Sequence, residues 1–553
     1  MVEMKQKGKR TGHHRTAVLP TTFRTAWYLT MLALASPAGA QPQVQEESPA
    51  SAAAAVPPRQ VMIEEYLVRG NTVLDARTIE QAVTPFLGPG RTLADVEAAR
   101  DALVAAYQAK GYQSVYVDLP EQQVEQGVVV LQVSETRIGR LRVVGAQYNS
   151  PLEVRRQVPA LEEGTVPDFN QAQAEMTALN RGPKRQVMPL VKQGSIAGTM
   201  DVDLKVDDST PWRGTAGVNN DYSADTSKLR ANLSIGHDNL WQLGHVASVS
   251  FFGTPSELGE TKVWSASYSA PLGSDGWSLE ANGYKSNSAV ASAGGTNVLG
   301  KGHAIGLKLN YTAPAAGTWW HSFSAGIDFK DNQEALVLGG ASAHVPLRYA
   351  PLNVGYNGFA QTESATYGLG LSLVAGTRAS FGYSSDSAAF DNKRYKAAPS
   401  FLVLKGDAST TWTLGSGAQL HGRVAGQLTD SPLVSGEQMA AGGAHSVRGY
   451  LSAEATGDYG ISGTLEWRTP QLRYLTLLEN WRLYAFADGA RLRLRNPLPE
   501  QKDLFGLDSA GVGTSFELWR DLSGKLEFAY PLRDGPRTAK NTRRLLFNVS
   551  ASY

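Results

Sequence analysis

The chain has 553 residues, no cysteine, and a formal net charge of +1 from 52 Lys and Arg against 51 Asp and Glu. This length exceeds one ordinary domain, and the lack of cysteine excludes a disulfide framework, a thiolate metal site and a cysteine nucleophile. The charge balance gives no indication of a nucleic-acid partner. With 56 glycines, 21 tyrosines and 11 tryptophans, the composition favours many short strands, turns and aromatic girdles over a helical protein.

Residues 1–40 have the pattern of a secretory signal peptide rather than that of a disordered basic tail. Several lysines and arginines precede an apolar stretch, Ala26 to Ala35, which is too short to span a bilayer as a helix. Ala38-Gly39-Ala40 then forms a small-x-small cleavage site. Residues 41–59 are rich in Gln, Glu, Ala and Pro, which predicts a linker. No later apolar run of about eighteen residues occurs, so no transmembrane helix is expected.

Residues 60–136 are predicted to form a compact βααββ unit. The first strand ends at the turn signal Gly70-Asn71, and Asp75 and Thr92 are placed to cap two successive helices. The second helix carries apolar side chains on one face at 3.6-residue spacing. Two further strands complete the unit.

Residues 137–210 repeat this order of elements, which indicates an internal repeat of about 70 residues whose copies can each fold alone. The expected elements are a strand ending at Gly145, a helix carrying Val154, Val158 and Leu161, a helix from Phe169 to Asn180, and strands from Arg185 to Lys192 and from Gly198 to Val206.

From residue 211 to residue 553, helical spacing gives way to alternation of apolar and polar residues. In the segment 323–330, for example, Phe, Ala, Ile and Phe alternate with Ser, Gly, Asp and Lys. Alternation over about ten residues is typical of a transmembrane β-strand, whereas soluble strands are usually about five or six residues long. About sixteen such strands can be placed, and a lipid-facing sheet must close into a barrel because unpaired edge groups are costly in hydrocarbon. The predicted strand starts lie near residues 213, 228, 245, 262, 277, 301, 321, 351, 365, 398, 418, 459, 481, 509, 524 and 544.

The connections between these strands fall into two lengths. Those after even-numbered strands, such as 415–417, are mostly short, and those after odd-numbered strands, such as 287–300 and 429–458, are generally longer. Outer-membrane barrels have short periplasmic turns and long external loops. The two N-terminal units are therefore expected in the periplasm. The last strand ends at Tyr553, and a terminal aromatic residue fits the assembly signal of such barrels.

Taken together, these features resemble those of two-partner secretion transporters, the haemolysin-activator branch of the outer-membrane POTRA-barrel superfamily. The resemblance extends from Val61 to Tyr553. It is carried by Val68-Arg69-Gly70-Asn71, Tyr107-x-x-x-Gly111-Tyr112, Pro120-x-Gln122 and Gly127 in the first unit, by Leu179-Asn180, Pro189, Gly194 and Gly198-Thr199 in the second, and by Gly217-Val218-Asn219-Asn220 at the barrel start. It implies two α+β POTRA domains followed by a 16-stranded antiparallel transmembrane β-barrel. Barrel-assembly relatives usually carry more POTRA domains, so this count favours secretion.

The resemblance also singles out two short motifs. The sixth external loop of this superfamily folds back into the barrel lumen, and here the loop at 429–458 carries Val447, Arg448, Gly449 and Tyr450. Phe486, Asp488 and Gly489 resemble the barrel-wall motif of the family, although Ala490 stands where glycine is common. Strand parity turns Asp488 towards the lumen. We therefore predict an ion pair between Arg448 and Asp488, with Gly449 allowing a tight tip and Tyr450 packing beside it.

The resemblance implies a pore in the Gram-negative outer membrane that exports one large, β-rich exoprotein by type V secretion. The POTRA domains would capture the unfolded exoprotein, and an extended segment could add to an exposed strand edge. A haemolysin, an adhesin, a contact-inhibition toxin or a haem-scavenging protein would all use a similar transporter. The other implied partners are outer-membrane lipid, the barrel-assembly machinery and periplasmic chaperones. No nucleotide-binding motif is present, so folding outside the cell is the expected energy source.

Three other classes of protein stay open. An assembly or insertion factor of the same superfamily would have a similar layout, whereas a passive porin needs no POTRA domain. An outer-membrane enzyme would need catalytic residues, yet no His/Ser/Asp arrangement or metal-ligand spacing stands out. No catalytic residue, cofactor or metal is therefore assigned, and His445 is interpreted as a polar loop residue. Residues 41–59 are also too short and too proline-rich for the N-terminal plug helix of some family members.

Overall fold

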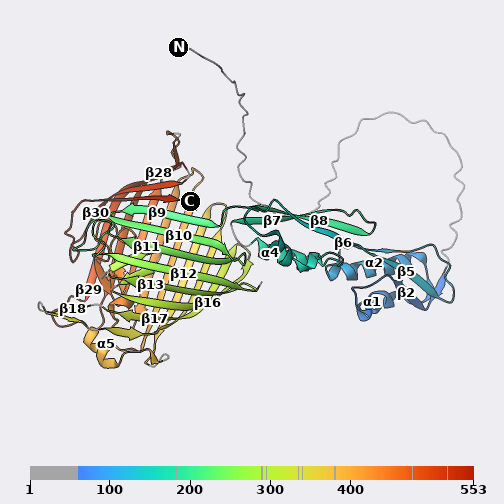
Figure 1. Ribbon diagram of the computed structural model, residues 1–553, viewed down its shortest axis with the longest axis horizontal. Coiled ribbons are helices and arrows are strands. Elements are labelled where there is room, and N and C mark those ends of the chain that lie inside the picture. Colours follow the sequence, from blue (N-terminus) through green and yellow to red (C-terminus); the bar gives the residue numbers. More distant parts are fainter. Residues whose placement is uncertain are drawn as a thin grey trace, which may run out of the picture. The chain divides into compact units, whose positions relative to one another are not determined.

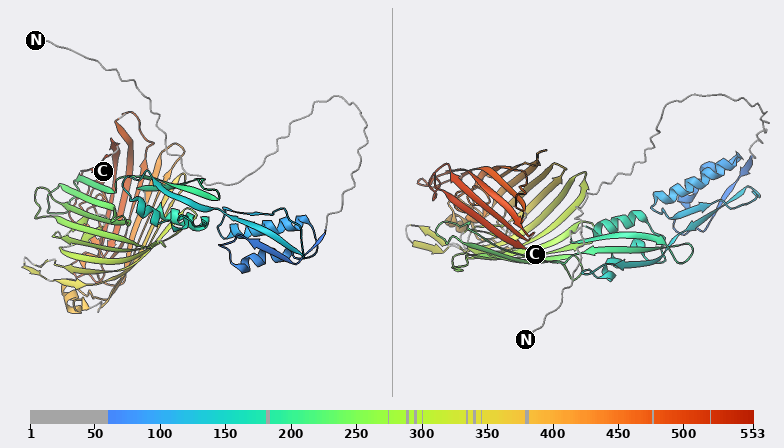
Figure 2. Two further views of the ribbon diagram at one scale, coloured as in Figure 1. Left: turned by 45° about the vertical axis from the view of Figure 1, so that its right-hand side comes forward. Right: turned by 90° about the horizontal axis from the view of Figure 1, so that it is seen from above.

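The computed structural model describes residues 60–553 except 181–183, 274, 288–289, 294–295, 300, 334, 339–340, 345, 379–381, 476 and 520. The predicted signal peptide (1–40) and linker (41–59) lie outside the described residues. The described chain forms two small α+β units followed by a large β-barrel (Figures 1 and 2). Among the described helices, none is both long and apolar enough to cross a membrane.

The first unit has the predicted βααββ order. Its sheet places β5 (Val128–Glu135) between the parallel strand β2 (Glu65–Arg69) and the antiparallel strand β4 (Val115–Asp118). The helices are α1 (Ala76–Val83) and α2 (Leu93–Ala109), and the shorter elements are β1 (Val61–Ile63), η1 (Thr84–Phe86) and β3 (Gly88–Arg91). Buried apolar side chains of α2 and of the sheet form one core, and they include Leu103, Tyr107, Val129 and Leu131.

Both predicted helix caps of this unit are confirmed. The side chain of Asp75 accepts a hydrogen bond from the backbone N–H of Thr78 at 2.9 Å. Thr92 and Asp95 form a reciprocal capping box at the start of α2. Such caps satisfy backbone donors that have no partner within the helix.

The second unit repeats this topology. Its elements are β6 (Arg137–Val144), α3 (Pro151–Arg156), η2 (Pro159–Leu161), α4 (Phe169–Leu179), β7 (Arg185–Gln193) and β8 (Thr199–Asp208). The sheet order β6-β8-β7 matches β2-β5-β4 of the first unit and leaves β7 at an edge. The prediction of a single helix carrying Val154, Val158 and Leu161 is wrong, because the chain forms two short helices there. Pro159 explains the break, since proline disfavours helical backbone at the preceding residue.

The barrel closes with sixteen strands among the described residues, and β31 pairs with β9 at the closure. Each predicted strand start lies within about five residues of an observed strand. The strands are β9 (Trp212–Asn219), β10 (Arg230–Leu240), β11 (His245–Gly253), β12 (Lys262–Leu272), β13 (Trp277–Ser286), β16 (Gly302–Ala316), β17 (Trp319–Asn332), β21 (Leu352–Gln361), β22 (Ala365–Gly376), β23 (Phe401–Thr413), β24 (Gln419–Thr429), β27 (Tyr459–Arg468), β28 (Leu478–Arg493), β29 (Leu504–Leu518), β30 (Leu522–Pro531) and β31 (Arg544–Ser552).

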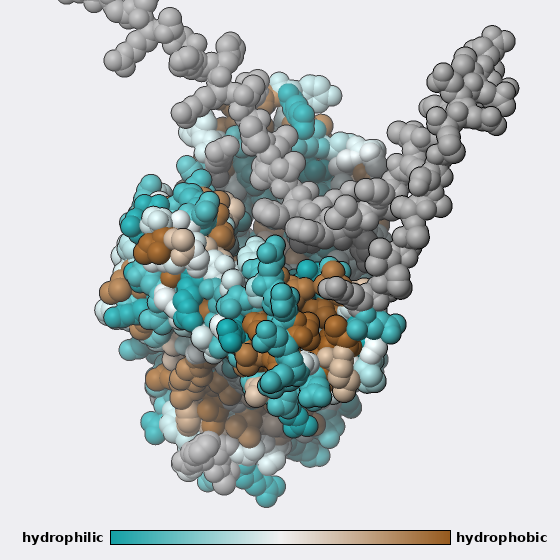
Figure 3. All heavy atoms as spheres, turned by 90° about the vertical axis from the view of Figure 1, so that its right-hand side faces the viewer, coloured by the Kyte–Doolittle hydropathy of each residue, from teal (hydrophilic) through white to brown (hydrophobic). Residues whose placement is uncertain are grey.

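The strand register gives the barrel an apolar outer face and a polar lumen. Ile327 on β17 pairs with Leu307 and Leu352, and all three alternate with lumen-facing polar positions such as Asp328 and Lys308. Many of these outward side chains are exposed. On the face drawn in Figure 3, brown hydrophobic patches lie among hydrophilic residues. The outward apolar side chains of the strands are what a lipid-facing barrel requires.

The connections have the predicted asymmetry. At one end of the barrel they are short, as at 317–318 and 414–418, and at the other end they are long, as at 377–400 and 430–458. The chain enters β9 at the short-turn end. The long connections carry the hairpins β14–β15 (Val290–Ala293, Thr296–Leu299) and β18–β19 (Ala335–Leu338, Ala341–His344), the short strand β20 (Leu347–Tyr349) beside β17, and the helix α5 (Ser387–Lys393).

Candidate functional site

Loop 6, residues 430–458 between β24 and β27, folds back onto the inner wall of the barrel. It contains a short helix, η4 (Ser435–Glu437), and a hairpin of β25 (Met439–Ala441) with β26 (Ala455–Gly457). The hairpin carries the tip of the loop. At this tip Val447 and Tyr450 are fully buried and Arg448 is 4% exposed. The motif singled out from the sequence therefore lies against the wall and away from solvent.

The predicted ion pair between Arg448 and Asp488 is formed. Asp488 lies on β28 and faces the lumen, as strand parity predicts. One of its carboxylate oxygens accepts hydrogen bonds from the backbone N–H of Arg448 at 3.0 Å and from Nε at 2.8 Å, and the other accepts one from Nη2 at 2.7 Å. This fork-to-carboxylate geometry is the strong form of the interaction.

Two further carboxylates complete the site, and sequence reasoning missed both. Nη1 of Arg448 donates to Glu466 on β27 at 2.7 Å and to Glu527 on β30 at 2.9 Å. We call Arg448, Glu466, Asp488 and Glu527 the arginine cluster. The alternation of polar and apolar residues alone predicts that both glutamates face the lumen. It does not predict that they lie level with Asp488, because that depends on the register between strands.

The charge of the cluster is nearly balanced by one more arginine. Arg468 donates to the second oxygen of Glu466 at 2.7 and 2.9 Å, and the hydroxyl of Tyr484 donates to Glu527 at 2.9 Å. Burial lowers the pKa of the Arg448 guanidinium, but the hydrogen bond and the charge of Asp488 raise this pKa by a larger amount. The net shift of the pKa is therefore upward. Arg448 therefore stays charged in the lumen.

An aromatic floor supports the guanidinium. The central carbon of the Arg448 guanidinium lies 3.5 Å from the ring centre of Phe486, which is a cation–π geometry. A Cβ on Gly511 would lie 2.4 Å from the Phe486 ring, and one on Gly513 would lie 2.5 Å from the Tyr484 ring. Both glycines belong to β29 and pair directly with these aromatic residues. Their missing side chains let the rings lie across the neighbouring strand.

The other motif residues fall into two groups. Gly449 has φ = +93°, and a Cβ there would lie 3.1 Å from Pro531, so glycine fits both the backbone and the wall. The hydroxyl of Tyr450 donates to the carbonyls of Asp508 and Arg533 at 2.9 and 2.8 Å. Gly489, by contrast, lies on the opposite face of β28 from Asp488 and does not join the cluster.

Ala490 occupies the position where the family pattern usually has glycine. It faces the lumen and packs in one buried apolar cluster with Val447 and Tyr450. The departure from the pattern therefore adds a methyl group to the floor on which the tip rests.

Two more carboxylates tie loop 6 to neighbouring loops. Glu454 accepts hydrogen bonds from the backbone N–H groups of Arg537 and Thr538 at 2.6 Å each. Asp458 is fully buried and accepts from the backbone N–H groups of Leu433 at 3.0 Å and Arg495 at 2.6 Å. The loop is thus held along its length and not only at its tip. Among the described residues, no group of three His, Cys, Asp or Glu side chains is suited to hold a metal ion.

A closed sixteen-stranded barrel with an inward loop, preceded by a βααββ unit, defines an outer-membrane protein of the POTRA-barrel class. The family model for "Haemolysin secretion/activation protein ShlB/FhaC/HecB" matches residues 198–516, more than half of the chain. The model for the ShlB-type POTRA domain matches residues 61–136. The chain belongs to the ShlB/FhaC/HecB family. It is an outer-membrane protein whose POTRA region lies in the periplasm.

Individual relatives agree with this family. The chain is 27% identical over 175 residues to the outer membrane transporter CdiB-2 of Burkholderia pseudomallei, a match that covers 31% of this chain and 29% of that one. It is 24% identical over 399 residues to the outer membrane transporter CdiB of Dickeya dadantii, covering 70% and 68% of the two chains.

Solved structures share the fold. CdiB from Escherichia coli superposes with a TM-score of 0.60 at 21% identity, over 92% of this chain and 93% of that one. BamA from Haemophilus ducreyi lacking POTRA domains 1–3 superposes with a TM-score of 0.52 at 15% identity, over 89% and 100% of the two chains. At these identities the likeness concerns the fold alone.

Proposed function

We propose that the protein is a translocation pore that exports a partner exoprotein across the outer membrane by two-partner, type V secretion. The observation that carries this proposal is the inward-folded loop 6, which the arginine cluster holds against a polar lumen in a chain of the ShlB/FhaC/HecB family. A loop that occupies the lumen suits a regulated conduit better than a permanently open porin. The exoprotein would be of the haemolysin, adhesin, contact-inhibition or haem-scavenging type.

The proposed role of the arginine cluster is to latch the tip of loop 6 to the barrel wall. Val447, Arg448, Gly449 and Tyr450 contribute the loop side of this latch, and Phe486 and Asp488 contribute the wall side. The burial of the ion pair supports this role, because an exposed pair adds only about 0–1 kcal/mol whereas a buried pair is costly to break. Gly489 does not contact Arg448, and we propose no role for it in the latch beyond its place in β28.

The proposed domain layout has two POTRA domains, at residues 60–136 and 137–210, before a barrel at 211–553. The second domain is supported by its order of elements and by its sheet order, which repeat those of the first. A signal peptide at 1–40 and a linker at 41–59 complete the layout. The exported chain would meet these domains in the periplasm, with chaperones as further partners.

We propose that the edge strand β7 receives an extended segment of the exoprotein. Its side chains at Met188, Leu190 and Val191 are 43%, 46% and 53% exposed. Among the described strands, β7 pairs with β8 alone, so its outer edge offers backbone groups to another strand. Strand addition of this kind binds many sequences through backbone hydrogen bonds. The other edge strand of this type, β4, has four residues against nine in β7.

Depletion of the protein from its host tests the proposal. We expect one large protein to disappear from the culture medium while the other outer-membrane barrels keep their levels. Quantitative proteomics of the medium and of the outer membrane measures both. A broad loss of outer-membrane barrels would contradict export and would favour an insertion factor. We also expect the neighbouring reading frame to encode a large β-helical secreted protein.

A further inference from the structure

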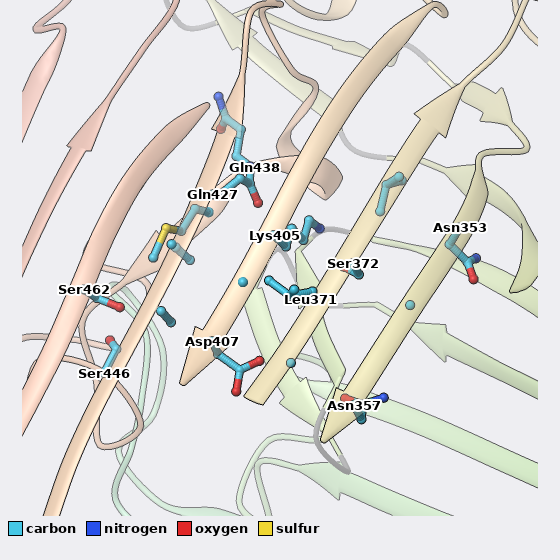
Figure 4. A pocket seen from close by; sticks show the side chains of 18 of the residues that line it. Asn353, Asn357, Leu371, Ser372, Lys405, Asp407, Gln427, Gln438, Ser446 and Ser462 are labelled. Carbon is cyan, nitrogen blue, oxygen red and sulfur yellow. The ribbon is translucent and has the colours of Figure 1, made fainter. Parts of the chain in front are cut away.

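A polar cavity of about 540 Å³ lies beside loop 6 inside the barrel. Figure 4 shows Asn353, Ser372, Asp407 and Gln427 on the neighbouring strands β21 to β24, with Gln438 of loop 6 also at the cavity. The volume falls in the range of ligand-binding pockets, about 300–1,000 Å³. Nothing in the latch proposed above makes use of this space.

The lining of the cavity suits an extended polypeptide of any sequence. Its charged residues have both signs, with Lys308, Lys405 and Arg423 against Asp328 and Asp407. The remainder is mostly serine, asparagine, glutamine and glycine, and no described lining residue is Phe, Tyr or Trp. Hydroxyl and amide groups can exchange hydrogen bonds with a passing backbone. A wall without aromatic anchors or an excess of one charge holds no particular side chain firmly.

The first part of loop 6 closes one end of this cavity. We call residues 433–438 the outer segment. Gly436 and Gln438 of this segment line the cavity directly, and Met439 and Ala440 at the start of β25 also line it. The contacts of the segment lie at the long-loop ends of the strands, since Lys330 is two residues from the end of β17 at Asn332. The outer segment is therefore a lid at the external end.

Glu437 locks this lid to the wall. Its side chain is 1% exposed and accepts from Nζ of Lys330 at 2.6 Å and from the hydroxyl of Tyr349 at 3.0 Å. Nζ of Lys405 lies 3.9 Å from its second oxygen. Gln427 on β24 donates to the backbone carbonyl of Glu437 at 2.9 Å. The carboxylate thus holds the outer segment to three side chains, and the backbone carbonyl of the same residue holds it to a fourth.

Apolar contacts seat the same segment among the external loops. Leu433 and Val434 are buried in a cluster with Leu347 and Tyr349 of β20, Phe390 of α5 and Phe401 of β23. These partners come from the loops on either side of β21 and β22 and from the wall itself. A packed plug therefore covers the external end of the cavity, beside His445 and Ser446 of the loop, which also line it.

The two attachments of loop 6 lie on different parts of the wall. The arginine cluster uses β27, β28 and β30, whereas Glu437 uses β17, β20, β23 and β24. No residue belongs to both sets. The strand β25, which follows the outer segment, packs with Val447 and Tyr450 of the tip, so we assign independent movement to residues 433–438 alone.

We propose that the outer segment is an external gate of the lumen above this cavity, which Glu437 keeps shut and which opens while the Arg448 tip stays in place. This inference rests on the proposed export function. It assigns opening to residues 433–438 and leaves the arginine cluster as a fixed pivot.

Ionic current through the purified full-length protein in planar bilayers tests the gate without any partner. In Glu437→Gln the lysines lose their counter-charge, and we expect the open probability to rise on the order of tenfold, the effect of losing one charged hydrogen bond. The control is Glu280→Gln, a carboxylate of β13 that faces the lumen outside the cavity; its current should equal that of the wild type. Heat-modifiable mobility on gels confirms that both barrels are folded.

An unchanged current in Glu437→Gln, or an equal rise in Glu280→Gln, would contradict the proposal that Glu437 keeps the gate shut. The double variant Lys330→Glu with Glu437→Lys restores opposite charges and should return the current to its wild-type level. Secretion by the host is measured separately. A gate that responds as expected in a strain that exports no partner would refute the export function and leave the gate intact.

A second measurement places the conduit within the lumen. The natural chain has no cysteine, so single cysteines react alone. In the Glu437→Gln background we expect a cationic thiosulfonate reagent to reduce the current of Ser372→Cys, which lines the cavity. Ser248→Cys, which faces the lumen from β11 outside the cavity, is the control. A reduced current in Ser248→Cys with an unchanged current in Ser372→Cys would show that ions pass through another part of the lumen.

Discussion

The guanidinium of Arg448 donates hydrogen bonds to carboxylates on β27, β28 and β30. Arginine suits this position because its planar fork offers five donors in fixed directions, and lysine offers a point charge on a flexible stem. The backbone N–H of the same residue adds a further bond to Asp488. A single side chain therefore joins the loop tip to three strands.

Removal of the arginine should release the tip. Arg448→Ala leaves Asp488 and Glu527 buried without a counter-charge, which costs on the order of 3–5 kcal/mol. We expect strongly reduced secretion with barrel insertion largely intact, and a weaker defect in Arg448→Lys because the charge remains. Secretion of the partner and heat-modifiable mobility measure the two effects. Normal export in Arg448→Ala would contradict the latch.

The partner carboxylates should matter unequally. Asp488→Ala removes three hydrogen bonds to Arg448, whereas Glu527→Gln removes one charge and can keep its bond to Tyr484. We expect a large secretion defect in the first variant and a small one in the second. An exchange of charges, Arg448→Asp with Asp488→Arg, should restore part of the export if the contact is direct. Equal defects in both single variants would show that the number of hydrogen bonds to Arg448 does not determine the size of the secretion defect.

At the scale of elements, the pairing of β28 with β29 prepares the floor on which the tip rests. Aromatic residues on β28 face glycines on β29, and the ring of Phe486 lies under the guanidinium of Arg448. Such pairing across strands is a recurring way to stabilise a sheet at glycine positions. The loop tip depends on this floor although the glycines never touch it.

Filling one of these glycines should therefore disturb the latch from a distance. A side chain at Gly511 meets the Phe486 ring and the carbonyl of Phe528, so Gly511→Val should destabilise the barrel by about 1–3 kcal/mol. Gly506→Ala on the same strand is the control, since its nearest neighbour lies at an ordinary 3.5 Å. The temperature at which each barrel loses its compact gel mobility measures the difference. Identical temperatures would show that the Phe486 ring can move aside without loss of stability.

The edge strand β7 carries a second prediction at this scale. Leu190→Lys adds a charge on its exposed surface, and charged residues discourage strand addition at an edge. We expect weaker secretion with an unchanged level of folded protein in the membrane. Ile196→Lys is the control because Ile196 is also exposed but lies in the turn after β7. Equal secretion in both variants would argue against capture at this edge.

At the scale of the whole molecule, β31 closes the barrel on β9 with five paired residues, Asn548 to Ser552 against Asn219 to Thr215. Adjacent strands elsewhere pair over longer stretches, as β28 and β29 do. Among the sixteen described barrel strands, the closure has the shortest run of paired residues. Export through the lumen does not require it to open, whereas insertion of another strand into the membrane would expose this edge.

A disulfide across the closure separates these two functions. A Cβ at Gly217 would lie 3.2 Å from that of Ser550, close to the 3.5–4.5 Å of natural disulfides. In this cysteine-free chain, Gly217→Cys with Ser550→Cys should form one bridge, and secretion should continue at the level of the reduced protein. Secretion that stops on oxidation and returns with a reductant would contradict export through a closed barrel.

Much of the architecture follows from local patterns in the sequence. The alternation of apolar and polar residues depends only on which side of a strand each residue faces, and it predicted the sixteen strands and the lumen-facing side of Asp488. The caps at Asp75 and Thr92 were predictable for a similar reason, because each involves neighbours within three residues. The apolar spacing from Val154 to Leu161 predicts one helix, but Pro159 disfavours helical backbone at the residue before it and so divides the segment in two.

The contacts at the centre of the barrel could not be predicted in this way. By itself, the sequence determined the strands, their two faces and the pairing of Arg448 with Asp488, since each follows from spacing along the chain or from a family motif. Only the tertiary structure decided that Glu466 and Glu527 join that pair and that Glu437 holds the outer segment to Lys330. The physical reason is that these contacts depend on the register of strands far apart in the sequence and on the path of a long loop, and neither is encoded in local periodicity.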